Sequence, residues 1–119
     1  MSAGAQFKAG DLDNAQAQLE WAADKGKDPA LSDLARLRLA AVLLQKGELD
    51  AALARLQVAP SAGYAARFAD LRGDVFAAQG KAAEARSAYQ AAIDALGAAG
   101  EQATTLREVV RVKLESLEG

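Results

Sequence analysis

Small and large apolar residues recur along the chain in the same order in three places. A glycine is followed five residues later by an alanine, and a large side chain and a second alanine then follow at i+4 and i+7 from the first alanine. Because this spacing keeps side chains on one face of a helix, each copy predicts a helix with a face of small residues. The positions are, in order, Gly10, Gly47 and Gly80; Ala15, Ala52 and Ala85; Leu19, Leu56 and Tyr89; and Ala22, Ala59 and Ala92.

The repeated pattern indicates pairs of helices joined at the glycines. A glycine can take the left-handed conformation that ends a helix, and the alanine face of the next helix lets the preceding one pack closely. The copies are spaced around the ~34-residue period of tetratricopeptide repeats. We therefore expect an all-α fold: a tetratricopeptide-type helical-hairpin solenoid with a C-terminal capping helix. The expected structural repeat positions are Gly47, Ala52, Leu56, Gly73, Gly80, Ala85 and Tyr89.

Capping residues predict where the helices begin. Asp28 followed by Pro29 is an N-cap with a proline in the first turn, and it predicts a helix through Lys46. We expect this helix to be buried on two sides, because its apolar positions are too many for one narrow stripe. They are Leu31, Leu34, Leu37, Leu39, Val42, Leu43 and Leu44.

Further boundaries lie in the second half of the chain. Ser61 is the expected cap of a helix that runs to Gln79, and residues 81–96 form its partner. Thr105 and Glu108 have the spacing of a capping box before the last helix. That helix has one expected apolar face, which suits the closing of a solenoid end. Its apolar residues are Leu106, Val109, Val110, Leu114 and Leu117.

The chain therefore predicts a single tetratricopeptide-like domain over residues 1–119. It divides into a partial first repeat (1–27), a repeat at 28–60, a repeat at 61–97 and the capping helix at 101–118. About a dozen residues of the first repeat's opening helix are missing, if the ~34-residue period holds. We expect the chain to be part of a longer protein.

Composition and charge narrow the possible functions. The 119 residues have a net charge of −2, a sequence pI near 5.1, and neither Cys nor His. The absence of a basic stripe argues against binding to nucleic acid. Without Cys or His, structural zinc, thiol nucleophiles and histidine bases are unavailable, so we expect no enzyme, no cofactor and no metal. No apolar run is long enough to cross a bilayer, so we do not expect this stretch to be embedded in a membrane.

Several segments resemble the YfgM-like family. They are Gln18 to Ala22, the Leu34 to Ala40 segment LARLRLA, Ala69 to Asp74 with its LRGD, Gly80 to Tyr89, and Val112 to Leu117. These proteins are ancillary subunits of the bacterial SecYEG translocon. The resemblance implies a protein anchored by one N-terminal transmembrane helix, with this domain on the periplasmic face of the inner membrane. It also implies a non-enzymatic role with a periplasmic chaperone of the peptidyl-prolyl isomerase type.

Two short motifs have simpler structural explanations. Arg72-Gly73-Asp74 falls inside a predicted helix, so we interpret Gly73 as a position of close helix packing rather than part of an adhesion loop. Gly80-Lys81 lacks the other residues of a phosphate loop. Trp21, which could anchor a partner, is expected to pack against the leucine-rich helix that follows it.

We expect a partner to bind in a groove on the concave face of the solenoid. The candidate groove residues are Arg38, Gln45, Tyr64, Arg67, Asp70 and Asp74. Asp70 and Asp74 are expected on a solvated face, where Arg67 could pair with either. The Lys and Asn that some tetratricopeptide domains use to clamp a terminal carboxylate are absent from the matching positions. An adaptor of another envelope assembly, in pilus or outer-membrane biogenesis, and a holdase chaperone that binds unfolded chains directly remain alternatives.

Overall fold

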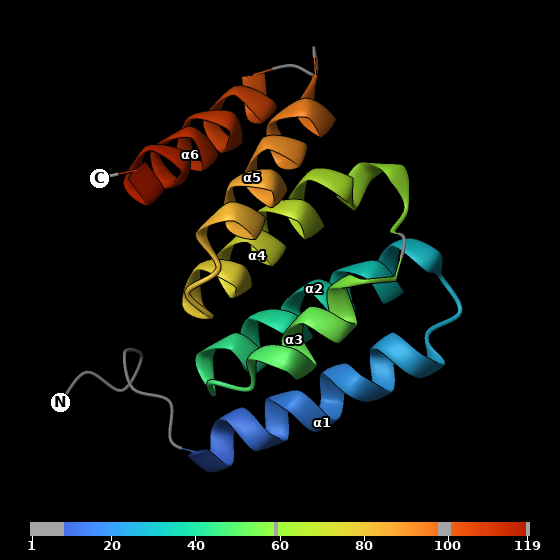
Figure 1. The fold of residues 1–119 in the computed structure, drawn as a ribbon. Helices are drawn as coiled ribbons and strands as arrows, with labels where there is room; N and C mark the ends of the chain where they lie inside the picture. The colour runs from blue at the N-terminus through green and yellow to red at the C-terminus, as the bar shows by residue number, and fades with distance from the viewer. Residues whose placement is uncertain (1–8, 59, 98–100, 119) are drawn as a thin grey trace, which may run out of the picture.

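The fold is a series of antiparallel helices stacked from the N-terminal to the C-terminal end (Figure 1). The computed structural model describes residues 9–58, 60–97 and 101–118. Within these residues every element is helical, as predicted. The elements are α1 (Ala9–Lys25), α2 (Pro29–Gln45), α3 (Leu49–Leu56), a 3-10 turn η2 (Ala62–Tyr64), α4 (Ala65–Ala78), α5 (Ala82–Leu96) and α6 (Glu101–Glu118).

Two helical hairpins turn at the glycines that the repeat pattern singles out. Gly47 joins α2 to α3 with φ +81°, and Gly80 joins α4 to α5 with φ +77°. At each turn the next residue donates a backbone hydrogen bond across the helix end, from Glu48 to Leu43 and from Lys81 to Phe76, both 2.9 Å long. This is the Schellman arrangement, in which a glycine closes the helix. The predicted turns are therefore confirmed at both positions.

Gly10 does not have the same role. It lies in the first turn of α1, which already begins at Ala9, and its φ is not positive. The prediction that Gly10 closes a preceding helix is wrong for this reason. Ala59, the expected repeat position at the end of α3, lies outside the described residues, as do residues 1–8 of the predicted first repeat.

The leucine-rich helix α2 is the centre of the N-terminal half. Asp28 caps it by accepting a hydrogen bond from the backbone N–H of Ala30 at 2.9 Å, and Pro29 occupies the first turn, as expected. The helix packs on α1, α3 and α4, so its burial on more than one side is confirmed. Its core cluster joins it to α3 and α4 and consists of Leu39, Ala40, Leu43, Ala52, Leu56, Phe68 and Val75.

A second cluster joins α4, α5 and α6. It contains Ala69, Ala85, Tyr89, Ala92 and Val110, all of which are almost fully buried. At its centre, Gly73 of α4 lies against the ring of Tyr89 of α5. A Cβ atom at Gly73 would come within 2.4 Å of two ring atoms, so only glycine permits this approach. The expectation that Gly73 is a packing position is confirmed.

Two predicted caps are wrong. Helix α4 begins at Ala65, after the 3-10 turn, and Ser61 instead accepts a backbone hydrogen bond from Tyr64 at 2.9 Å. Thr105 lies inside α6, which begins one turn earlier at Glu101, so it cannot cap that helix. For α4, the Ser61 backbone N–H donates to Asp33 of α2, so the segment ahead of the helix is held by a contact that the local sequence does not contain.

Three apolar residues that were expected to pack inward are exposed instead: Trp21, Leu31 and Val109. Leu31, in the first turn of α2, is 62% exposed. Trp21 is 67% exposed, because α1 contacts α2 through Leu19 and Ala23, on the opposite side of the helix. Val109 is 46% exposed, while its neighbour Val110 is fully buried. The expected packing of Trp21 against α2 is therefore wrong, and α6 turns only part of its expected apolar face inward. Within the described residues, no helix is both long and apolar enough to span a bilayer.

Candidate functional site

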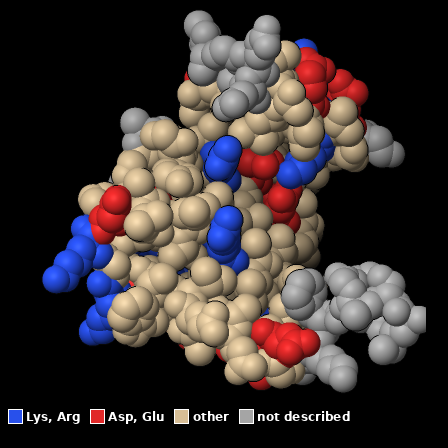
Figure 2. All heavy atoms as spheres, turned by 180° about the vertical axis from the view of Figure 1, so that it is seen from behind, with Lys and Arg blue, Asp and Glu red and all other residues tan. Residues whose placement is uncertain are grey.

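A groove crosses the first helices of the two hairpins, α2 and α4, which we call the A helices. Figure 1 draws α3 and α5 in front of the A helices, so Figure 2 looks onto the A-helix side from behind. Side chains about one helical turn apart on each A helix face the groove, and α6 closes one side of it. The groove is lined by Leu37, Arg38 and Ala41 of α2, Arg67, Asp70 and Leu71 of α4, and Leu106 of α6.

The groove has an apolar floor and a basic rim. Leu37, Leu71 and Leu106 are half-buried and present aliphatic surface, while Arg38 and Arg67 are exposed. Neither arginine has a hydrogen bond or ion pair to any residue that the structure describes. Figure 2 shows basic side chains standing on a largely uncharged surface, with acidic ones close by. Two guanidinium groups are thus available to a binding partner.

The aspartates beside the groove are already paired. Lys113 of α6 donates hydrogen bonds to Asp70 at 3.0 Å and to Asp74 at 3.2 Å. The Tyr89 hydroxyl donates to Asp74 at 2.6 Å, and the Lys113 ammonium lies 5.9 Å from the centre of the Tyr89 ring. The pair expected between Arg67 and one of these acids is absent from the described residues, because the Lys113 side chain reaches both of them.

Burial and charge shift the pKa values in this cluster. Burial raises the pKa of Asp70, and the hydrogen bond from Lys113 only partly offsets it. Burial lowers the pKa of Lys113, but the hydrogen bond and charge of Asp70 outweigh this effect and raise it overall. Burial and the hydrogen bond to Asp74 raise the pKa of Tyr89 well above its usual value. The lysine and the phenol therefore keep their protons throughout the neutral range.

The structure brings three of the six predicted groove residues into one pocket: Arg38, Arg67 and Asp70. Gln45 is exposed on the same face of α2, one turn further along. Tyr64 packs against the core cluster of α2, α3 and α4, and Asp74 is bound to Lys113 and Tyr89. Whether a partner contacts these residues stays a prediction.

Sequence reasoning missed Leu106 and Lys113. Leu106 was assigned to the packing face of the last helix, yet it also borders the groove. Lys113 precedes Leu114 and so lies at the edge of that same face. The sequence does contain an indication of its role. A lone lysine on the border of an apolar helix face can reach acids on the neighbouring helix.

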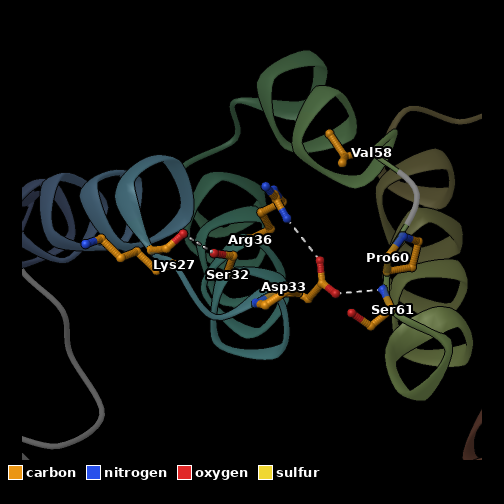
Figure 3. Close-up of a pocket in the computed structure, with 9 residues that line it drawn as sticks. Lys27, Ser32, Asp33, Arg36, Val58, Pro60 and Ser61 are labelled. Carbon is orange, nitrogen blue, oxygen red and sulfur yellow. Dashed lines mark hydrogen bonds and ion pairs between the residues drawn. The ribbon is translucent and has the colours of Figure 1, made fainter.

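A second pocket lies between the loop that follows α1, the first half of α2 and the segment that follows α3, and it is lined by a buried acid (Figure 3). Asp33 is 3% exposed; it accepts hydrogen bonds from the Ser61 backbone N–H at 2.6 Å and from Arg36 at 3.0 Å. Burial raises the pKa of Asp33, but the bonds to Ser61 and the charge of Arg36 outweigh this effect and lower it overall. Because the carboxylate is fully engaged, it holds the loop before α4 in place.

The two short motifs are part of the packing. In the Arg72-Gly73-Asp74 tripeptide, Arg72 donates to the backbone oxygen of Leu56 at 3.2 Å, and Asp74 accepts from Tyr89. Gly80-Lys81 forms the hairpin turn between α4 and α5. Among the residues that the structure describes, no three His, Cys, Asp or Glu side chains gather closely enough to hold a metal ion.

The stacked hairpins and the groove across the A helices define a helical-repeat scaffold. A sequence model of the tetratricopeptide repeat-like domain matches residues 1–119, and the chain belongs to this family. The predicted fold class is thereby confirmed.

Ancillary subunits of the SecYEG translocon from two bacteria are similar to this chain along most of its length. The ancillary SecYEG translocon subunit of Neisseria gonorrhoeae is 38% identical over 117 residues, which is 98% of this chain and 54% of that protein. The protein of the same name in Escherichia coli is 35% identical over 107 residues, or 90% of this chain and 50% of that protein. The resemblance seen in the sequence is confirmed. The chain spans about half the length of these relatives, and no solved structure matches it significantly.

Proposed function

We propose that this chain is the interaction domain of an ancillary SecYEG translocon subunit and that it holds a segment of a partner protein in the groove across the A helices. The role is one of binding and not of catalysis. The relatives named as ancillary subunits of that translocon support the assignment, because they are similar over nearly the whole chain.

The proposal also includes a location and a second partner. The domain would stand on the periplasmic face of the inner membrane, held there by an N-terminal transmembrane helix of the full-length protein. It would connect the translocon with a periplasmic chaperone of the peptidyl-prolyl isomerase type. Family resemblance alone supports these two points.

One observation carries the binding role: the groove combines half-buried leucines with two arginines that form no ion pair with any described residue. Apolar area at the centre and charge at the rim are the usual composition of a protein-binding surface. Leu37, Leu71 and Leu106 supply the first feature, and Arg38 and Arg67 supply the second.

Site-specific crosslinking in membranes tests the proposal. A photoreactive amino acid replaces Ala41, which lines the groove, or Ala91, an equally small and exposed residue on α5 outside it. We expect the Ala41 variant of the full-length protein to form adducts with a translocon subunit or the chaperone, and the Ala91 variant to form few. Adducts from Ala91 alone would contradict the groove as the binding surface. Adducts with an outer-membrane or pilus assembly protein would favour the adaptor alternative.

A holdase role is the second candidate, and exposed apolar side chains favour it. Trp21 and Leu31 are 67% and 62% exposed, and Val58 is 47% exposed. Surfaces of this kind can hold unfolded chains when they form a continuous patch. If the full-length protein suppresses the aggregation of a model substrate, and a Trp21→Ala, Leu31→Ala variant does not, this role is supported.

A further inference from the structure

The positive and negative side chains around the groove do not cancel. Asp70 and Asp74 share Lys113, while neither Arg38 nor Arg67 forms an ion pair with any described residue, so the cations Arg38, Arg67 and Lys113 exceed the two carboxylates by one charge. A segment entering the groove therefore meets positive charge that the domain itself does not neutralise. Like charges brought together at an interface are repelled, and opposite charges hasten association and fix orientation.

Exposed aliphatic side chains also stand on α2 and α6 outside the residues that line the pocket. On α2, Leu31 lies one and two turns before Leu34 and Arg38 on the same helix face, and it is 62% exposed. On α6, Val109 and Val112 follow Leu106 at i+3 and i+6 and are 46% and 60% exposed. Within the pocket itself, Leu37, Leu71 and Leu106 carry aliphatic surface from α2 across α4 to α6.

The size of this surface sets the length of its occupant. Neighbouring helices pack with axes 8–10 Å apart, so the path from α2 over α4 to α6 is roughly 20 Å long. About six residues of extended chain or about 13 residues of helix would cover it. This is the size of one short segment, not of a folded domain.

We propose that the groove binds an acidic amphipathic segment of a partner protein, whose apolar side chains rest on Leu37, Leu71 and Leu106 and whose carboxylates pair with Arg38 and Arg67. The inference rests on the proposed function, because it names the chemistry of the segment that the groove would hold. Guanidinium groups suit this task, since their planar fork can bind a carboxylate through two hydrogen bonds. The carboxylates belong to side chains along the segment, in keeping with the absence of the terminal-carboxylate clamp.

The first test reverses the charge of the rim in the full-length protein. Arg38→Glu with Arg67→Glu is compared with Lys81→Glu with Arg111→Glu, which changes the net charge equally at exposed positions outside the groove. We expect crosslinks from Ala41 to fall about tenfold in the first variant and to change little in the second, since two attractive pairs become repulsive. Both variants should retain the wild-type melting temperature.

The second test uses peptide probes with the purified full-length protein. One probe is a 13-residue helical peptide with leucines on one face and glutamates beside them, and the other has lysines in place of the glutamates. We expect the glutamate peptide to bind at least about tenfold more tightly, and the Arg38→Glu, Arg67→Glu variant to reverse this preference.

The outcomes separate the two proposals. If Ala41 yields no adducts, the groove is not a binding surface and both fail. If Ala41 yields adducts that the rim reversal leaves unchanged, the groove binds a partner but the acidic preference is wrong. Equal binding of the two peptides, or binding of neither while groove adducts form, also overturns the acidic preference. Adducts between two copies of this chain would identify the occupant as a second copy and overturn a separate partner.

Discussion

The same sequence pattern is buried to different depths at the two ends of the molecule. In α5 the repeat positions Ala85, Tyr89 and Ala92 are almost fully buried, whereas the matching Ala15, Leu19 and Ala22 of α1 are only half-buried. Helix α5 packs between α4 and α6, while α1 packs mainly against α2. A repeat pattern therefore specifies which side chains could be buried, and the neighbouring helices determine how far they are.

The largest expected effect on stability comes from a substitution against the buried helix α5. Gly73→Val places side-chain atoms where the Tyr89 ring lies, and we expect a loss of about 3 kcal/mol or more in the free energy of unfolding. Urea unfolding followed by circular dichroism measures it. Gly10→Ala is the matched control, because nothing lies within 4 Å of a Cβ atom there; this change should be neutral or slightly stabilising. Equal effects of the two substitutions would refute the packing role of Gly73.

Leu56 and Leu19 occupy the same repeat position and allow a direct comparison. Leu56 is fully buried in the core cluster of α2, α3 and α4, so Leu56→Ala should cost about 3 kcal/mol. Leu19 is half-buried on α1, so Leu19→Ala should cost only about 1 kcal/mol. Unfolding curves for the two variants measure the difference. If the losses were equal, the burial of α1 described above would be wrong.

Alkaline pH should weaken the C-terminal half first. The pKa values of Lys113 and Tyr89 are raised in the folded state, so both groups hold their protons more tightly there than in the unfolded chain. Their contribution to stability is complete below their unfolded pKa values, near pH 10, and is lost as the pH rises through the folded values. We expect the melting temperature to fall above about pH 10.

The control for this pH effect is a double variant, Tyr89→Phe with Lys113→Met. It should be less stable at neutral pH but should show a shallower decline in alkali, because the two titrating groups are gone. Melting curves recorded from pH 7 to pH 11 make the comparison. An unchanged slope would show that other groups cause the decline.

The smallest expected effect on stability comes from a substitution on the exposed helix α1. Trp21→Ala removes a side chain that is 67% exposed, so it should change the free energy of unfolding by less than about 0.5 kcal/mol. Urea unfolding measures this change. If Trp21 were packed in the core, its removal would lower the free energy of unfolding several times more. Tryptophan fluorescence offers a second readout, because the only Trp of the chain should emit at the long wavelengths typical of solvent exposure.

Features that depend on neighbours in the chain could be predicted from the sequence. The turns at Gly47 and Gly80, the cap at Asp28 and the packing role of Gly73 all follow from backbone geometry or from the repeat register. Each of these features depends on only a few residues, and the types of those residues are enough to predict it. The groove side of α2 was predictable in the same way, since helical spacing places Arg38 and Gln45 on one face of the helix.

Features that depend on distant residues were missed. The start of α4 is set by Asp33, which lies 28 residues before Ser61 and caps the loop from another helix. The acids of α4 are paired with Lys113, some 40 residues later in the chain, and not with the nearby Arg67. The exposure of Trp21 likewise depends on which side of α1 contacts α2. Sequence spacing along one helix does not contain this information.

The docking of α6 has a consequence for the face that it borders. Without Lys113, the two arginines and two aspartates around the groove would cancel, and a passing segment would meet a nearly neutral surface. With α6 in place, Lys113 pairs with both aspartates and the sum rises to one net positive charge, while the arginines form no ion pair with any described residue. The last helix is therefore more than a lid on the solenoid, because its lysine determines the sign of the charge that the groove presents to a partner.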